Sequence, residues 1–203
     1  MIQYIIVAFC AYLLGCSSMS FYLSKLRGVD IRSKGSKNLG ASNAMILMGW
    51  KAGIFVGIHD IGKAALAVVL ARVFFPSLTY ISFLAGVACV LGHIFPFYLK
   101  FKGGKGFASF VGMTLALNWK FALILIVLAI LVTLITDYIV VGTTLTIVSV
   151  PAYYAVTTLN WIIPAILCIA SLIILYKHRS NYVKIYNGTE VRFRHANRGD
   201  YRE

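Results

Sequence analysis

Three short segments carry most of the side chains that could bind a ligand, and each one adjoins a long apolar run. They read "GSKNLGASN" (residues 35–43), "KFKGGKG" (100–106) and "YKHRSNYVKIYNGTE" (176–190). Glycine turns allow successive backbone N–H groups to point at one anion, and lysine adds positive charge. Because cations, amides and hydroxyls outnumber carboxylates here, we expect a phosphate-bearing ligand, and neither a metal ion nor another cofactor.

The first segment contains two glycines, two serines and two asparagines. Ser42 or Asn43 is expected to cap the helix that follows, and a helix N-terminus attracts phosphate. The alternative is an ordinary turn with an N-cap, because the same residue types dominate turns.

The second segment places Lys105 on a glycine-rich turn before a short apolar run. It is not a P-loop, since Leu99 stands where the first glycine belongs and Gly106 where a hydroxyl should bind magnesium. It could still bind a phosphate. The alternative is an interfacial turn whose lysines only reflect membrane topology.

The third segment follows the last apolar run. If that helix continues, His178 and Asn181 lie one turn apart on the same face. The alternative is a helix end that frays into a basic tail.

The elements that must position these segments are membrane-spanning helices. Of the 203 residues, 60% are hydrophobic and only 12% are charged, whereas about a quarter of the residues in a soluble domain are charged. We predict one all-α, polytopic membrane domain over residues 1–203. About seven spans are expected from stretches of bilayer length, at residues 3–24, 53–75, 80–99, 106–118, 121–136, 139–157 and 160–176. The fourth is short, and could be tilted or re-entrant.

Lysine and arginine gather in two loops, about residues 25–52 and 98–106, and in the tail, residues 177–203. By the positive-inside rule these segments face the cytoplasm and the N-terminus lies outside. Five spans are the alternative, if residues 106–136 form one long helix and the last two spans form a hairpin that does not cross. The net charge of +13 fits this topology and attraction to anionic lipid, so no nucleic-acid partner is expected.

The second predicted span has a pattern of its own. Glycines spaced by four, from Gly49 to Gly57, form a stripe that allows close helix packing. Asp60 continues this stripe and Lys63 follows one turn later, so we expect a buried pair that supports a polar pocket. His59 points elsewhere and is expected to be incidental.

The three segments resemble a known family. "GSKNLGASNA", "GHIFPFYLKFKGGKGFAS", and "HRSN" followed by "GTE" are similar to the three cytoplasmic motifs of bacterial acyl-phosphate:glycerol-3-phosphate acyltransferases (the PlsY type). Length, motif spacing and topology are similar as well, so the resemblance covers nearly the whole chain.

The resemblance implies a multi-pass enzyme of the bacterial inner membrane with its active site on the cytoplasmic side. Such an enzyme transfers an acyl group from acyl phosphate to the 1-hydroxyl of sn-glycerol 3-phosphate. The product is lysophosphatidic acid, for phospholipid synthesis. Its partners would be these two substrates, membrane lipid and an upstream enzyme that forms the acyl phosphate. An acyl phosphate is already activated, so the tasks are to hold two anions together and to stabilise charge at the carbonyl oxygen.

The resemblance also assigns site residues by position. The implied catalytic residues are Ser36, Lys105, His178 and Asn181. The implied substrate- and phosphate-binding residues are Gly40, Asn43, Gly103, Gly104, Gly106, Thr143, Gly188 and Glu190.

Four positions depart from the family pattern, one of them Thr143, which replaces a serine but keeps a hydroxyl. Ile46 and Asp137 replace arginines and Val140 replaces a serine, which removes two cations near a site for dianions. A divergent paralogue with another acceptor, another donor or little activity is therefore the main alternative, and an unpaired Asp137 in the pocket would favour it. A small transport or lipid-binding protein is a further alternative, but it should have polar residues at mid-membrane depth in several spans.

Overall fold

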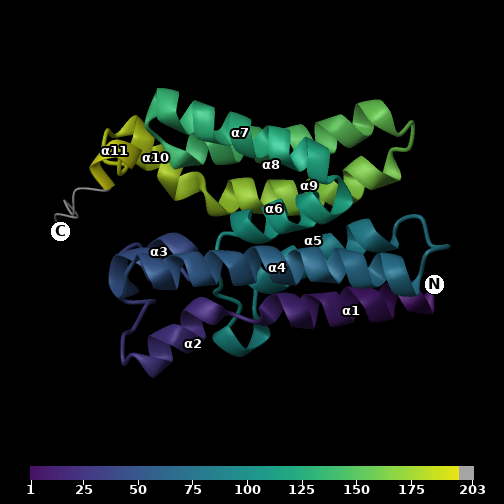
Figure 1. Cartoon of the computed structure of the whole chain (residues 1–203), viewed down its shortest axis with the longest axis horizontal. Coiled ribbons are helices and arrows are strands. Elements are labelled where there is room, and N and C mark those ends of the chain that lie inside the picture. Colours follow the sequence, from purple (N-terminus) through teal and green to yellow (C-terminus); the bar gives the residue numbers. More distant parts are fainter. Residues whose placement is uncertain (197–203) are drawn as a thin grey trace. The chain divides into compact units, whose positions relative to one another are not determined.

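The computed structural model describes residues 1–196, and no strand occurs among these residues (Figure 1). The all-α fold class is confirmed. The helices are α1 Ile2–Cys16, α2 Met19–Leu26, α3 Ala41–Met48, α4 Trp50–Phe74, α5 Ile81–Ile94, the 3-10 helix Phe97–Leu99, α6 Phe107–Leu117, α7 Trp119–Thr136, α8 Ile139–Thr157, α9 Ile162–Lys177, α10 Arg179–Tyr186 and α11 Phe193–Ala196. Arg198 and Arg202 of the expected basic tail lie outside the described residues.

Within the described residues, five segments are long and apolar enough to cross a membrane: Ile2–Leu26, Trp50–Phe74, Ile81–Leu99, Trp119–Thr136 and Ile139–Thr157. A sixth candidate is the pair α9 and α10, which bends by 44°. With 11 residues, α6 is shorter than the roughly 20 residues that a full crossing needs. The multi-pass character is confirmed, whereas seven spans and an outward N-terminus stay predictions.

Two helix boundaries differ from the sequence-based expectation, and a third agrees with it. The first predicted span is broken at Ser17, whose ψ of 124° leaves the helical region, and Ser18 caps α2 by accepting from the N–H of Phe21. The third ends as an α-helix at Ile94, since Pro96 cannot donate a helical hydrogen bond. Residues 106–136 are not one helix, because the side chain of Asn118 caps α7. This break rules out one long helix over residues 106–136, while the number of spans stays a prediction.

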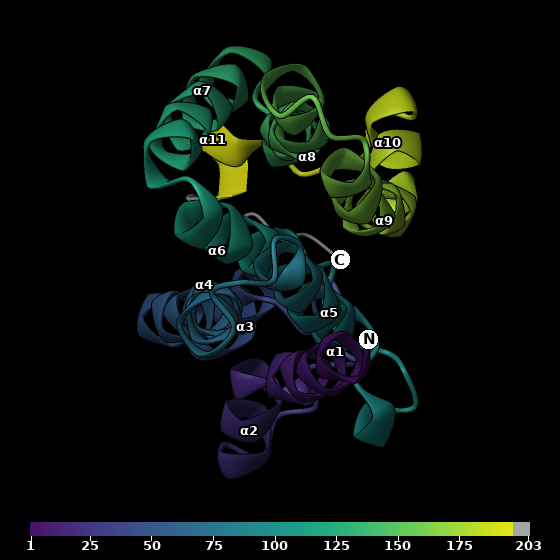
Figure 2. The ribbon, with the colours of Figure 1, turned by 90° about the vertical axis from the view of Figure 1, so that its right-hand side faces the viewer.

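The chain divides into two compact units, Met1–Leu117 and Asn118–Glu203. In the first, α1 packs on α5 and α6 packs on α4 (Figure 2). Glycines allow these helices to meet at their backbones, because a Cβ on Gly15 would overlap the carbonyl of Cys89 and a Cβ on Gly112 would overlap the carbonyl of Ile61. Small residues at such contacts are the usual means of close packing between membrane helices.

The glycine stripe of α4 faces α3. Gly53 lies against Met45 and the carbonyl of Ala41, and Gly57 faces the Ala41 side chain. The predicted close approach is therefore confirmed for these two glycines. Gly49 has another role, since it precedes α4 with a φ of +89°, a conformation that favours glycine.

In the second unit α7, α8 and α9 pack in chain order. The ring of Phe121 stacks on that of Tyr153 with 4.0 Å between centroids, and the Ser171 hydroxyl donates to the carbonyl of Ile147 at 3.0 Å. A single domain over residues 1–203 stays a prediction.

Candidate functional site

The loop before α3 is organised by Asn43, which is fully buried. Its amide nitrogen donates to the carbonyls of Ile31 at 2.8 Å and Lys34 at 3.2 Å, and its amide oxygen accepts from the N–H of Ser36 at 2.9 Å. Gly35, with a φ of +59°, leaves no room for a Cβ beside this oxygen. Asn43 therefore shapes the loop that presents the exposed Ser36.

The prediction that Ser42 or Asn43 caps the following helix is wrong. Gly40 is the N-cap residue of α3, in an extended conformation. Ser42 and Asn43 both lie inside the first turn of the helix. Asn43 reaches back across the loop, and Gly35 allows the chain to pass close to its amide oxygen.

In the second loop, the N–H groups of Gly103 and Gly104 donate to the carbonyls of Ile94 at 3.0 Å and His93 at 3.1 Å. Both N–H groups therefore bind the last two residues of α5, rather than an anion as we expected. Close packing explains why glycine is required, since a Cβ on Gly103 would overlap the His93 carbonyl and a Cβ on Gly104 would overlap the His93 ring.

Lys105 lies between this clamped pair and Gly106, which has a φ of +94° and accepts from the N–H of Phe110 through its carbonyl at 2.9 Å. The backbone of Lys105 is therefore held on both sides, just before α6 begins. Ser109 in the first turn of α6 is fully buried, and its hydroxyl has no hydrogen-bond partner among the described residues. Sequence inspection passed over this hydroxyl.

In the third segment the helix continues past His178, but with a bend at that residue. Nδ1 of the buried His178 lies 2.8 Å from the Ile174 carbonyl. A carbonyl only accepts, so Nδ1 carries a proton and Nε2 is the basic nitrogen of the neutral ring. The amide of Asn181 donates to Glu190 at 2.6 Å across the turn formed by Gly188, whose φ is +70°.

Thr143 is buried in α8, and its hydroxyl donates to the carbonyl of Ile139 at 3.1 Å. The next residue, Thr144, contacts the hydroxyl of Tyr182 at 2.7 Å and so joins α8 to α10.

Asp137 has a partner. It ends α7 in the left-handed conformation, its carboxylate accepts from the N–H of Arg194 at 3.0 Å, and its carbonyl accepts from the N–H of Phe193 at 2.8 Å. The Arg194 side chain donates to the carbonyl of Leu134 at 2.8 Å. This carboxylate therefore holds the C-terminal segment beside the end of α7.

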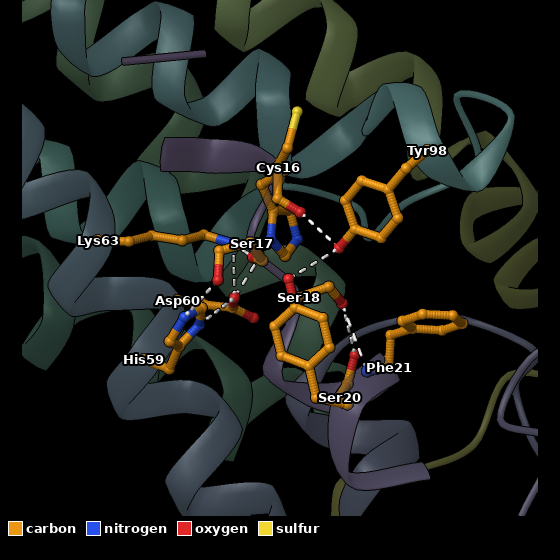
Figure 3. A network of polar contacts seen from close by, with 11 residues as sticks. Cys16, Ser17, Ser18, Ser20, Phe21, His59, Asp60, Lys63 and Tyr98 are labelled. Carbon is orange, nitrogen blue, oxygen red and sulfur yellow. Dashed lines mark hydrogen bonds and ion pairs between the residues drawn. The ribbon is translucent and has the colours of Figure 1, made fainter. Parts of the chain in front are cut away.

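A buried polar network lies at the break between α1 and α2 (Figure 3). The predicted pair of Asp60 and Lys63 is confirmed, with 2.9 Å between charged atoms. Lys63 also donates to the carbonyl of Ser17 at 2.7 Å. Nδ1 of His93 lies 3.0 Å from the lysine nitrogen and 3.3 Å from the carboxylate. We call Asp60, Lys63 and His93 the buried ionic network.

From the sequence, His59 was misjudged and His93 was missed. His59 is not incidental, since its ring lies 3.1 Å from the Ser17 hydroxyl and 3.5 Å from Asp60. His93 was not singled out, although a histidine within an apolar span needs a polar partner as much as a carboxylate does. That cost was the signal available in "GHIFPF".

The predicted site residues thus form two groups, one in each unit. The first contains Ser36, Gly40, Asn43, Gly103, Gly104, Lys105 and Gly106, and the second contains Thr143, His178, Asn181, Gly188 and Glu190. Their convergence in one site stays a prediction. Among the described residues, no cluster of three or more histidine, cysteine or acidic side chains could bind a metal ion.

Comparison with known proteins covers nearly the whole chain. Residues 5–188 match the family described as glycerol-3-phosphate acyltransferase. Glycerol-3-phosphate acyltransferase 1 of Oceanobacillus iheyensis is 37% identical over 200 residues, covering 93% of this chain and 94% of the relative. The enzyme of Clostridioides difficile is also 37% identical, over 194 residues, with the same coverage.

Two solved structures are similar too. The crystal structure of PlsY (YgiH), an integral membrane glycerol 3-phosphate acyltransferase, matches in its glycerol 3-phosphate form with a TM-score of 0.87 and 29% identity, covering 94% of this chain and 95% of that one. Its lysophosphatidic acid form matches with a TM-score of 0.84 and 28% identity, covering 93% and 94%. This chain belongs to the glycerol-3-phosphate acyltransferase family.

Proposed function

We propose that this protein transfers an acyl group from acyl phosphate to the 1-hydroxyl of sn-glycerol 3-phosphate and so forms lysophosphatidic acid. The observation that carries this proposal is the near full-length similarity to a solved enzyme in its glycerol 3-phosphate form and its lysophosphatidic acid form. The two segments that supply Lys105 and His178 support it, because they offer a cation and a base.

In the proposed reaction the 1-hydroxyl oxygen attacks the acyl carbonyl carbon. A carbon–oxygen ester bond forms, the bond from that carbon to the phosphate oxygen breaks, and inorganic phosphate leaves. The hydroxyl proton passes to Nε2 of His178 and from there to the departing phosphate. No covalent enzyme intermediate is needed, since the mixed anhydride is already activated.

Lys105 would neutralise phosphate charge as the anhydride bond breaks, and a preorganised cation lowers the barrier for such a step. Ser36 would orient a substrate oxygen, presented by the loop that Asn43 holds. Asn181 would contribute an amide whose position Glu190 sets through their hydrogen bond. Gly40, Gly103, Gly104, Gly106 and Gly188 would shape the turns, and Thr143 would line the site.

We propose further that the protein lies in the bacterial inner membrane with this site on the cytoplasmic side, where an upstream enzyme supplies acyl phosphate. The basic residues of the motif loops support that orientation. An unpaired Asp137 would have favoured the paralogue alternative, but its carboxylate accepts a hydrogen bond from the backbone of the C-terminal segment.

The test is release of inorganic phosphate from palmitoyl phosphate by the detergent-purified protein, with and without glycerol 3-phosphate. We expect release that depends on glycerol 3-phosphate, with one lysophosphatidic acid formed per phosphate. Palmitoyl-CoA as the only donor should give no product. Folded protein without acceptor-dependent release would contradict the proposal, and activity with palmitoyl-CoA would contradict the donor.

A further inference from the structure

The buried ionic network has no role in the reaction described above, yet one of its members contacts the second motif loop. We propose that His93, held by Asp60 and Lys63, is a positioning residue that sets the place of Lys105 by clamping Gly103 and Gly104. This inference rests on the proposed function, because Lys105 matters only if it binds substrate phosphate.

The network fixes His93 from one side. The side chains of Asp60 and Lys63 are each 3% exposed, and that of His93 is 5% exposed. Nδ1 of His93 can accept from the Lys63 ammonium at 3.0 Å or donate to the Asp60 carboxylate at 3.3 Å. Since both charged groups lie on the Nδ1 side, the imidazole has one polar edge bound and its orientation is determined.

The opposite edge of the same ring meets the loop. The atom nearest to the position that a Cβ on Gly104 would occupy is Nε2 of His93, followed by the two ring carbons beside it. The His93 carbonyl accepts from the N–H of Gly104, and the carbonyl of Ile94 accepts from that of Gly103. One residue thus contacts the loop through both its side chain and its backbone.

Lys105 is the next residue, and the chain leaves it through Gly106 directly into α6. A shift of Gly104 therefore moves the Lys105 backbone with it, because the two residues are joined by one peptide bond. Displacement of a binding group by about 1 Å can lower a rate about 100-fold. A carboxylate, an ammonium and an imidazole are costly to place within apolar helices. Their role would then be to fix the position of the loop that contains Lys105.

His59 provides a matched control. It contacts the same carboxylate, at 3.5 Å, and the Ser17 hydroxyl at 3.1 Å. Both of these contacts lie away from the second motif loop. If the network only stabilises the helices, His59 and His93 variants should behave alike. If His93 positions the loop, only the His93 variant should alter it.

The first experiment compares His93→Asn with His59→Asn in detergent. Asparagine keeps a polar atom near the position of Nδ1 and loses the ring edge that faces Gly104. We expect kcat/KM for glycerol 3-phosphate to fall about 10- to 100-fold in His93→Asn and to change less than about threefold in His59→Asn. Equal losses in both variants would overturn the proposal.

Two further measurements keep the proposal testable. In a Lys105→Ala background, His93→Asn should have little additional effect on kcat/KM, since the two residues act as one unit; full additivity would contradict it. If His93→Asn does not fold, Gly104→Ala takes its place, because the added Cβ would force the His93 ring and the loop apart. Unchanged activity in that variant would contradict the proposal.

A readout independent of turnover separates this inference from the proposed function. Hydrogen–deuterium exchange of residues 100–106 should be faster in His93→Asn than in wild type and unchanged in His59→Asn. If wild type lacks acyltransferase activity but exchange behaves as expected, the clamp stands and the proposed function fails. If wild type is active and exchange is the same in all three proteins, the clamp is wrong.

Discussion

Lys105 supplies the positive charge in the second motif loop, and the same loop offers a control for it. Lys102 is exposed and lies only three residues earlier. We expect Lys105→Ala to lower kcat/KM about 100-fold or more, since a lost preorganised charge at a phosphate typically costs that much. Lys102→Ala should stay within about threefold of wild type, because only bulk charge is removed.

The measurement is acceptor-dependent phosphate release by each purified variant at matched folded concentration. If both lysines contributed equally, the loop would act as a general cationic surface and Lys105 would have no special role. A Lys105→Arg variant refines the result, because arginine keeps the charge but presents it as a planar fork.

Asn43 is a residue whose importance lies in the loop it holds. Its side-chain amide forms hydrogen bonds with backbone groups of Ile31, Lys34 and Ser36. Asn43→Ala removes the hydrogen-bond partner of these three backbone groups, and the hydrogen bonds that are lost are buried or partly buried. Since an unsatisfied buried polar group costs about 1–3 kcal/mol, we expect the free energy of unfolding to fall by about 2–4 kcal/mol.

Asn38→Ala is the matched control, because Asn38 lies in the same loop and is partly exposed. Its free energy of unfolding should change by less than about 1 kcal/mol, as is usual for surface positions. Chemical unfolding in detergent would measure both variants. Equal stabilities would show that the Asn43 amide is not what holds the loop.

At the scale of the helices, backbone contact through glycine is the feature most sensitive to substitution. Gly112 of α6 lies against the carbonyl of Ile61 in α4, whereas the exposed Gly62, the next residue of α4, has open space around it. We expect Gly112→Ala to lower stability by about 1–3 kcal/mol, as overpacking does. Gly62→Ala should be neutral or slightly stabilising, because alanine favours a helix.

Thermal unfolding of the two purified variants compares the same chemical change at neighbouring positions. A loss of stability in Gly62→Ala as large as that in Gly112→Ala would mean that glycine content, and not helix contact, determines stability. An unchanged Gly112→Ala would mean that α6 can move away from α4 at no cost.

Hydropathy predicted where helices lie but not how they end or bend. The apolar runs that became α4, α7 and α8 were placed within about three residues of their observed ends. The break at Ser17 was missed, because α1 and the start of α2 are both apolar and a one-dimensional profile passes through them. The bend at His178 was not predicted, because the expected span ended at residue 176 and hydropathy does not report the direction of the polar helix that follows. Such breaks are tolerated where neighbouring groups bind the freed carbonyls, as Lys63 does for Ser17.

The same limit applies to the candidate site. Asp60 and Lys63 were predicted as a pair because they lie one helical turn apart in the sequence. His93 could not be assigned to that pair, since it lies 30 residues further along the chain and sequence periodicity does not report contacts between helices. The hydrogen bonds of Gly103 and Gly104 to the end of α5 could not be predicted for the same reason, although the glycines themselves were recognised.

At the scale of the whole molecule, the uneven distribution of lysine and arginine predicts which segments lie on each side of the membrane. Positive charge is retained on the cytoplasmic side during insertion. With seven spans, Lys102 and Lys184 should face the cytoplasm, and Lys120 and Leu159 should face the outside. All four residues are exposed in the structure, so each is a suitable place for a single reporter cysteine.

The experiment begins by replacing the native Cys10, Cys16, Cys89 and Cys168 and adding one cysteine at a time. A membrane-impermeant thiol reagent should label Lys120→Cys and Leu159→Cys on intact cells. Lys102→Cys and Lys184→Cys should react only after the cells are permeabilised. Labelling of Lys184→Cys on intact cells would put His178 and Lys105 on opposite sides of the membrane, and no single site could then contain both residues.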